Sequence, residues 1–137
     1  MQVGIDIVEV ERIKSAIEKN PKFIEKVFTE KEIEYCEARK NKYESYAGRF
    51  AAKEALSKAI GTGFRDLSFL DIEVTNNALG KPKISYKDIK ASISISHETH
   101  YAISIVIIEG EWYVKFKVRY DTINRSCNNT SIDRKKV

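Results

Sequence analysis

The order of apolar and polar positions divides the chain into a helical first half and a strand-rich second half. Residues 3–10 (VGIDIVEV) alternate and are rich in Ile and Val, which predicts a strand. From Ile13 onward apolar residues recur at helical spacing, and this pattern stops before Asn20-Pro21. A second helical unit, KFIEKVF, follows at once. The chain is therefore predicted to begin with one strand and two short helices.

Two further helices are predicted before the pattern changes. Thr29 and Glu32 have the spacing of a capping box, which predicts the start of a helix over EKEIEYCEARK. The longest helix should run from about Tyr43 to Ile60 and end at Gly61, since glycine readily takes the left-handed conformation of a helix C-cap. This long helix contains the stretch RFAAKEALSKAIGTG, which holds most of the candidate chemistry.

Strands dominate the pattern after residue 63. SFLDIEVTNN is followed by a turn at residues 77–80, and KPKISY returns from that turn. ASISISH and YAISIVIIEG predict a hairpin of β-branched strands. A strand, then helices, then antiparallel strands predict an α+β domain, in which an antiparallel sheet packs against helices that include the long one. We assign residues 1–110 to this domain.

Residues 111–137 depart from the pattern. Residues 111–121 alternate well enough for a possible extra strand, and the polar, basic residues 122–137 are expected to be disordered. The tail holds seven Lys/Arg and three Asp/Glu, whereas residues 1–110 hold 17 of each kind. The net charge of +4 therefore arises in the tail, and the balanced domain argues against a nucleic-acid partner.

Composition excludes several classes of protein. The sequence contains no run of about 18 uncharged apolar residues, so no membrane span is predicted. The first residues carry acids where a secretory signal would carry bases. We therefore expect a cytoplasmic protein with no membrane partner. Cys36 and Cys127 are too few for a disulfide framework and are expected to be free thiols.

The long helix carries a carboxylate and an amine among small apolar residues. At 100° per residue, Glu54 and Lys58 share an arc with Phe50 and two alanines. The two charges can form an ordinary surface pair, worth about 0.2–0.5 kcal/mol. Alternatively they face a ligand or another subunit, for which the alanines would leave room. The pattern leaves both interpretations open.

Asp6 raises the same question within the first predicted strand. A buried, unpaired carboxylate there would be costly. Asp6 either faces water or, if the strand lies beside the long helix, converges with Glu54. Two converging carboxylates suit Mg²⁺, which also binds waters and substrate phosphates. We therefore hypothesise a Mg²⁺ site at Asp6 and Glu54.

Several basic and glycine-rich positions favour a phosphate-rich ligand. The turn Gly61-Thr62-Gly63 is either a simple C-cap or a source of backbone donors for an anion. The bases near this turn are Arg49, Lys53 and Lys58, and a second turn adds Lys81 and Pro82. His97, at the end of a predicted strand, is either structural or a ligand-binding residue.

Four motifs in order resemble the holo-[acyl carrier protein] synthase family, the short class of 4′-phosphopantetheinyl transferases. They are GIDIVEVERI, GRFAAKEALSKAIGTG, NALGKPKI and SISHETHYAISIVI, and the resemblance covers about residues 3–109. It implies transfer of 4′-phosphopantetheine from coenzyme A to a serine of acyl carrier protein, with release of adenosine 3′,5′-bisphosphate. That reaction would support fatty acid synthesis.

The resemblance also implies roles for individual residues. Asp6 and Glu54 would bind Mg²⁺, and Lys58 would act with Glu54 in catalysis at the pyrophosphate. The coenzyme A site would comprise Arg49, Lys53, Lys58, Gly61, Thr62, Gly63, Lys81, Pro82 and His97. Arg12, with Lys14, would contact the acidic recognition helix of the carrier protein. The short class is typically a homotrimer with sites between subunits. The alanine face of the helix would make room for coenzyme A and for a neighbouring protomer.

Two other functions fit parts of the sequence. A different Mg²⁺-dependent enzyme of phosphate esters, such as a small nucleotide hydrolase, would share the carboxylates and bases. A nucleic-acid-binding module would use the bases and aromatic residues of the tail. Strand alternation explains those same tail residues, which weakens the second alternative.

Overall fold

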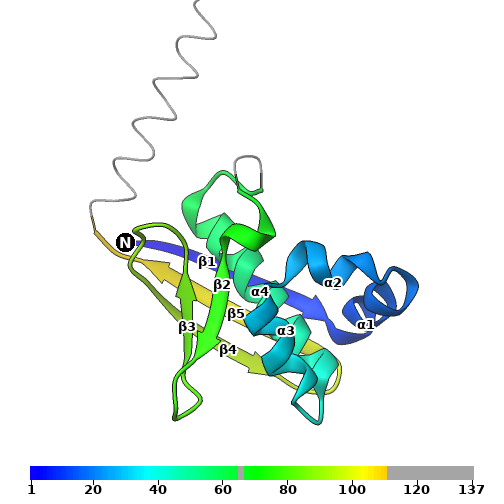
Figure 1. The fold of residues 1–137 in the computed structure, drawn as a ribbon. Coiled ribbons are helices and arrows are strands. Elements are labelled where there is room, and N and C mark those ends of the chain that lie inside the picture. Colours follow the sequence, from blue (N-terminus) through cyan, green and yellow to red (C-terminus); the bar gives the residue numbers. More distant parts are fainter. Residues whose placement is uncertain (65–66, 111–137) are drawn as a thin grey trace, which may run out of the picture.

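A three-stranded antiparallel sheet packed on one long helix forms the centre of the molecule (Figure 1). The structure is a computed structural model, which describes residues 1–64 and 67–110. The predicted strand at 111–121, the tail at 122–137 and Cys127 lie outside the described residues. The α+β class predicted from the sequence is confirmed.

The sheet joins the two ends of the described chain. Its strands are β1 (Gln2–Glu9), β4 (Ala91–His97) and β5 (Tyr101–Ile108), in the order β1-β5-β4. Both pairings are antiparallel, and β4 and β5 form the predicted hairpin. Strands β1 and β4 are therefore the two edges of the sheet, a placement that separates the cavities described below.

Four helices connect β1 to the second half of the chain. They are α1 (Val10–Lys19), α2 (Lys22–Val27), α3 (Glu30–Glu37) and α4 (Lys42–Ile60). The predicted capping box starts α3: the N–H of Glu32 donates to Thr29 Oγ1 (3.4 Å), and the N–H of Thr29 donates to Glu32 Oε1 (2.9 Å). Gly61 ends α4 with φ of 90°, as predicted. No helix among the described residues is both long enough and apolar enough to cross a membrane.

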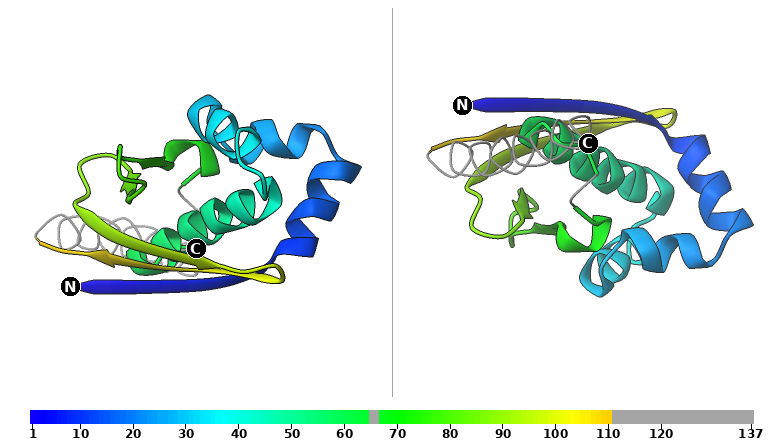
Figure 2. Two further views of the ribbon diagram at one scale, coloured as in Figure 1. Left: turned by 90° about the horizontal axis from the view of Figure 1, so that it is seen from below. Right: turned by 90° about the horizontal axis from the view of Figure 1, so that it is seen from above.

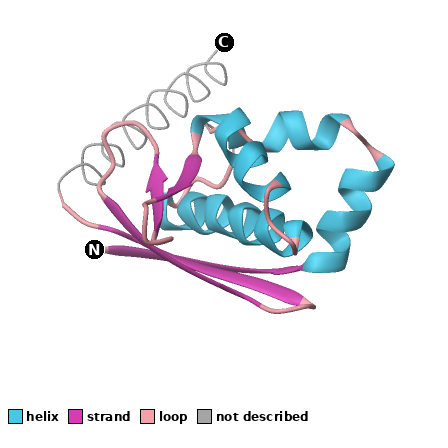
Figure 3. Ribbon diagram, turned by 60° about the horizontal axis from the view of Figure 1, so that its bottom comes forward, coloured by secondary structure: helices cyan, strands magenta, loops and turns pink. Residues whose placement is uncertain are grey.

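Helix α4 is enclosed on both sides. The sheet covers one side, and α2 and α3 lie on the other (Figures 2 and 3). The alanines of α4 are fully or almost fully buried, and Ala52, Ala55 and Ala59 belong to the same core cluster as Val106. A Cβ atom on Gly4 would lie only 1.8 Å from the carbonyl oxygen of Ala55, so only glycine lets β1 approach α4 this closely.

The packing of α4 within the chain corrects one expectation. The alanine face was predicted to make room for coenzyme A and a neighbouring subunit. The two alanines of that face, Ala47 and Ala51, are instead fully buried within the chain, and Ala47 belongs to the same core cluster as Ala102 of the sheet.

Strands β2 (Glu73–Asn76) and β3 (Pro82–Ser85) form a separate two-stranded antiparallel sheet rather than extending the main one. Where the sequence predicted the first part of a strand, the short 3₁₀ helix η1 (Phe69–Asp71) forms instead. Ser68 and Asp71 cap it reciprocally, which satisfies the backbone locally and delays the strand. The hairpin lies off the main sheet, on the side of α4 (Figure 2).

Candidate active site

Strand β1 and helix α4 bring Asp6 and Glu54 to one cavity of about 350 Å³. Ile13 and Ala16 of α1 supply part of its apolar wall, and Arg12 of the same helix lines it as well. Ile7 and Val8 of β1 and the aromatic rings of Phe23 and Phe50 complete the lining. The two carboxylates that the sequence analysis paired thus lie at the same cavity, which we call the acidic cavity.

The two carboxylates affect each other. Burial raises the pKa of Glu54, and the negative charge of Asp6 raises it further, whereas Lys58 lowers it. The ionised form of Glu54 is therefore less favourable here than in water. A divalent cation bound between Asp6 and Glu54 would remove this repulsion.

Lys58 binds Asp6 rather than forming a surface pair with Glu54. Its Nζ lies 2.8 Å from Asp6 Oδ1 and donates also to the carbonyl oxygen of Ile5 (3.0 Å). The Lys58 side chain is 53% exposed, so its ammonium reaches solvent and can move away from Asp6. Asp6, Glu54 and Lys58, which the sequence analysis placed together, form one charged group.

Arg49, Pro82 and His97 share a second cavity of about 190 Å³, which we call the arginine cavity. It lies at the β4 edge of the sheet, whereas the acidic cavity lies at the β1 edge. The remaining lining residues are Tyr35, Arg39, Ser45, Gly48, Asn76, Gly80 and Ile95. The basic residues give this cavity the character of an anion site.

The guanidinium of Arg49 is held in place by protein partners. Its Nη2 donates to Asn76 Oδ1, and its Cζ lies 3.9 Å from the centroid of the Tyr35 ring. Arg49 is only 4% exposed, and its Nε has no hydrogen-bond partner within the part of the chain that the structure describes. A buried cation with an unpaired donor fits an anionic ligand, because such groups are normally satisfied.

His97 has a partner and also lines the arginine cavity. Its Nδ1 lies 3.0 Å from Glu44 Oε1, and its side chain is 41% exposed. A carboxylate partner orients an imidazole, so the structural and ligand-binding interpretations of His97 are compatible. Lys81 lies beside Pro82 at a neighbouring cavity that Asn77 also lines.

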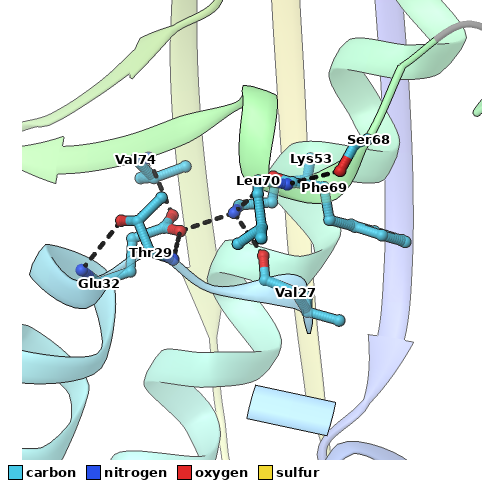
Figure 4. A network of polar contacts seen from close by, with 8 residues as sticks. All are labelled: Val27, Thr29, Glu32, Lys53, Ser68, Phe69, Leu70 and Val74. Atoms are coloured by element: carbon cyan, nitrogen blue, oxygen red, sulfur yellow. Dashed lines mark hydrogen bonds and ion pairs between the residues drawn. The ribbon is translucent and has the colours of Figure 1, made fainter. Parts of the chain in front are cut away.

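Lys53 lines neither cavity. Its Nζ is fully buried and donates to Glu32 Oε1 (2.6 Å), the carbonyl of Val27 (2.6 Å) and the carbonyl of Phe69 (2.9 Å), as Figure 4 shows. These three bonds use all three ammonium protons. The prediction that Lys53 contacts the nucleotide is therefore not supported, and we leave Lys53 out of the proposed ligand set.

The Gly61-Thr62-Gly63 turn acts locally in the structure. The N–H of Gly61 donates to Ser57 O (3.1 Å), as a C-cap does, and Thr62 Oγ1 donates to Gly63 O (3.3 Å). The turn lines neither the acidic nor the arginine cavity. Its C-cap role is observed, and its contact with a ligand stays a prediction.

The two residues of α1 that were predicted to contact the carrier protein lie apart in the structure. Arg12 lines the acidic cavity, whereas Lys14 Nζ lies 5.6 Å from the centroid of the Tyr43 ring. The predicted carrier-binding pair thus shares a helix but not a contact surface. Cys36 is a buried free thiol, as predicted, and burial raises its pKa to about 12.

Sequence reasoning missed several residues of the site. Tyr35, Glu44 and Asn76 are the partners of Arg49 and His97, and Glu32 is the partner of Lys53. No motif marks Tyr35 or Asn76, because their roles arise only when α3 and β2 pack against α4. Glu32 was assigned to a capping box, and nothing local indicated that its carboxylate is also buried.

The donor set indicates which metal ion the acidic cavity could hold. Among the described residues, no three His, Cys, Asp or Glu side chains cluster as metal ligands. Two carboxylates are too few for a structural zinc site. They fit Mg²⁺, which keeps several waters and takes further ligands from substrate phosphates. Asp6 and Glu54 are the residues that would hold it.

Comparison with known proteins places the chain in a family. The model of the 4′-phosphopantetheinyl transferase superfamily matches residues 2–114. The holo-[acyl-carrier-protein] synthase of Clostridium tetani is 53% identical over 120 residues, which cover 80% of this chain and 95% of that protein. The synthase of Clostridium perfringens is 43% identical over 126 residues, or 81% of this chain and 95% of that protein.

Solved structures of similar proteins agree with this family assignment. The crystal structure of a holo-(acyl-carrier-protein) synthase from Bacillus anthracis in complex with CoA (3′,5′-ADP) has a TM-score of 0.73 at 42% identity, covering 80% of this chain and 96% of that one. The Helicobacter pylori synthase in complex with coenzyme A has a TM-score of 0.72 at 36% identity, covering 78% and 99%. The chain therefore belongs to the 4′-phosphopantetheinyl transferase superfamily. The resemblance to holo-[acyl-carrier-protein] synthases, and the prediction that the chain is such an enzyme, are confirmed.

Proposed function

We propose that this enzyme transfers the 4′-phosphopantetheine of coenzyme A to a serine of apo acyl carrier protein, with Mg²⁺, and releases adenosine 3′,5′-bisphosphate. The reaction would take place in the cytoplasm and support fatty acid synthesis. The observation that carries the proposal is the meeting of Asp6 and Glu54 at one cavity, with Lys58 bound to Asp6. The relatives solved with coenzyme A support the choice of donor.

Phosphoryl transfer needs positioning and charge neutralisation more than covalent help from the protein. Mg²⁺ bound at Asp6 and Glu54 would neutralise charge on the pyrophosphate. Lys58 can exchange its bond to Asp6 for a phosphate oxygen, because its side chain is half exposed. The serine proton would pass either to a carboxylate directly or to a water held by Glu54.

The arginine cavity is the proposed site of the nucleotide phosphates. Arg49 offers an unpaired, buried donor, and His97 lies beside it with its ring oriented by Glu44. We assign these two residues to the 3′-phosphate. Lys81, Pro82 and the Gly61-Thr62-Gly63 turn are proposed to complete the coenzyme A site.

The separation of the two cavities supports a site between subunits. The acidic cavity lies at the β1 edge of the sheet and the arginine cavity at the β4 edge. One coenzyme A would therefore bind the acidic cavity of one copy and the arginine cavity of its neighbour, as in the proposed homotrimer. Val3, Ile5 and Ile7 of β1 are more than half exposed, an apolar surface that a second copy would cover.

The carrier protein is proposed to dock on α1. Arg12 lines the acidic cavity, so an acidic helix bound to it would bring its serine near Asp6 and Glu54. Lys14, on the same helix, would add positive charge outside the cavity.

One experiment tests the proposal directly. Incubation of the enzyme with coenzyme A, Mg²⁺ and an apo carrier protein should increase the carrier's mass by about 340 Da, the mass of the transferred arm. A hydrolase of phosphate esters would consume coenzyme A and leave the mass of the carrier unchanged. That second result would overturn the proposed function.

A further inference from the structure

Lys53 and Glu32 form an ion pair in the interior of the molecule, and both side chains are 0% exposed. Their bonds reach three other segments of the chain (Figure 4). Lys53 Nζ donates to the carbonyls of Val27, at the end of α2, and Phe69, in η1. Glu32 Oε2 accepts from the N–H of Val74 in β2 (2.9 Å). The pair therefore ties α2, α3, η1 and β2 to α4.

The η1 and α2 bonds lead to the acidic cavity. The ring of Phe69 stacks on Phe50 with centroids 5.4 Å apart, and Phe50 lines that cavity. Helix α2, whose last residue is Val27, also carries Phe23, another lining residue. Lys53 thus holds η1, whose Phe69 stacks on Phe50, and α2, which carries Phe23.

The β2 bond leads to the arginine cavity. Asn76, two residues after Val74 on the same strand, accepts the hydrogen bond from Arg49. The turn that follows β2 supplies Gly80, and β3 supplies Pro82. Glu32 therefore holds the strand on which one wall of the arginine cavity is built.

Stability alone gives little reason for such a pair. Withdrawing two charges from water is costly, and well-packed apolar residues often serve a fold equally well. Burial lowers the pKa of Lys53, an effect that the Glu32 carboxylate opposes. The pair is favoured over apolar packing where several backbone groups from different segments must be held in one arrangement.

We propose that Lys53 and Glu32 are positioning residues that hold the ligand-contacting walls of both cavities on α4. This inference rests on the proposed function, because it concerns the binding of nucleotide and carrier. The carboxylates of the acidic cavity do not depend on the pair. Asp6 lies on β1, and β1 meets α4 directly through Gly4 and Ala55. Loosening the pair should therefore weaken nucleotide binding but leave Mg²⁺ activation unchanged.

The test uses the double substitution Lys53→Met with Glu32→Gln, which removes both charges and keeps the side-chain volumes. The dissociation constant of adenosine 3′,5′-bisphosphate, measured by calorimetry on the full chain, should rise about tenfold, since misplaced binding groups are costly. The Mg²⁺ concentration for half-maximal transfer, at saturating coenzyme A, should stay within about twofold. A variant that lost only folded protein would show fewer binding sites with an unchanged dissociation constant.

The matched control is Lys42→Met with Glu37→Gln. This pair also joins α3 to α4, with a 3.3 Å contact, but both side chains are more than a third exposed. The control should leave nucleotide binding unchanged. Tenfold weakening in the control, or unchanged binding in the folded Lys53/Glu32 variant, would overturn the inference.

If the double variant does not fold, a milder variant tests whether Lys53 and Glu32 position the binding residues. Glu32→Gln alone removes the charge and keeps one acceptor oxygen, so that either the Thr29 or the Val74 N–H loses its partner, and it should weaken nucleotide binding about threefold. Wild-type binding in that variant would then overturn the inference. If the wild-type enzyme itself neither binds the nucleotide nor modifies a carrier, the proposed function fails, which is a distinguishable result.

Discussion

The acidic cavity and the arginine cavity differ in how their charges are held. At the acidic cavity the carboxylates repel each other, and the Lys58 ammonium beside them is half exposed. At the arginine cavity the guanidinium of Arg49 is buried, bonded to Asn76 and stacked on Tyr35. The first site can rearrange its charges when partners change, whereas the second is built before any ligand arrives.

This difference separates two tasks. A reacting centre must exchange partners, because charge moves during the reaction, and mobile or mutually strained groups permit this. A recognition pocket must present one arrangement, and immobilising its groups in advance lowers the entropy lost on binding. The predictions below test this separation, beginning with the largest expected effect.

Glu54→Gln should reduce transferase activity by about 100-fold or more, because it would remove a proposed ligand of the Mg²⁺ ion at the site where charge develops. The free energy of unfolding should stay the same or rise. Since the pKa of Glu54 is raised, its ionised form is less favourable in the folded state, and glutamine removes that cost. The mass-shift assay and thermal unfolding measure the two quantities.

The control for this variant is Glu25→Gln, at an exposed position of α2. It should retain full activity. Wild-type activity in Glu54→Gln would refute the metal assignment and, with it, the task given to the acidic cavity.

Arg49→Lys should raise the KM for coenzyme A by about 10- to 100-fold, because hydrogen bonds to charged groups contribute about 1.5–3 kcal/mol. Lysine keeps the charge but loses the planar donor that stacks on Tyr35 and reaches Asn76. The concentration of Mg²⁺ for half-maximal activity should not change. Steady-state kinetics with each component varied separates the two effects, and a shifted Mg²⁺ requirement would contradict the separation of tasks.

Arg12→Glu should raise the KM for the carrier protein by about tenfold through like-charge repulsion of its acidic helix. Coenzyme A binding, followed by calorimetry without carrier, should remain near the wild-type value. Lys14→Glu is the natural comparison, since Lys14 contacts Tyr43 instead of the acidic cavity, and its effect should be smaller. A collapse of coenzyme A affinity in Arg12→Glu would show that α1 is not the docking surface.

The pH dependence of Mg²⁺ affinity should reveal the repulsion between Asp6 and Glu54 in the acidic cavity. The proposed Mg²⁺ site would require ionised Glu54, so the affinity for Mg²⁺ should fall with decreasing pH, beginning above the pH at which an ordinary glutamate is protonated. In Asp6→Asn the pKa of Glu54, followed by carboxyl NMR, should decrease because one like charge is gone. It should stay above the ordinary value, because burial is the larger cause of its shift. An unchanged pKa would mean that the two carboxylates do not interact.

Much of the fold was predictable because its signals are local. The Thr29–Glu32 capping box, the end of α4 at Gly61 and the β4–β5 hairpin each depend on residues a few positions apart. The same holds for the four motifs that identified the family. The first part of the predicted strand at residues 68–76 was wrong, because Ser68 and Asp71 cap a 3₁₀ turn there.

Within the site, the residue types were predictable, but their environments were not. The sequence alone determined that Asp6, Glu54 and Lys58 carry chemistry suited to a cation and phosphates. Only the tertiary structure decided that β1 crosses α4 at Gly4 and brings Asp6 to Glu54, or that Lys53, next in sequence to Glu54, is enclosed with Glu32. The physical reason is that local periodicity sets which way a side chain leaves its own helix or strand. Whether it then meets water, an opposite charge or a ligand depends on segments far away in the chain, which only packing brings together.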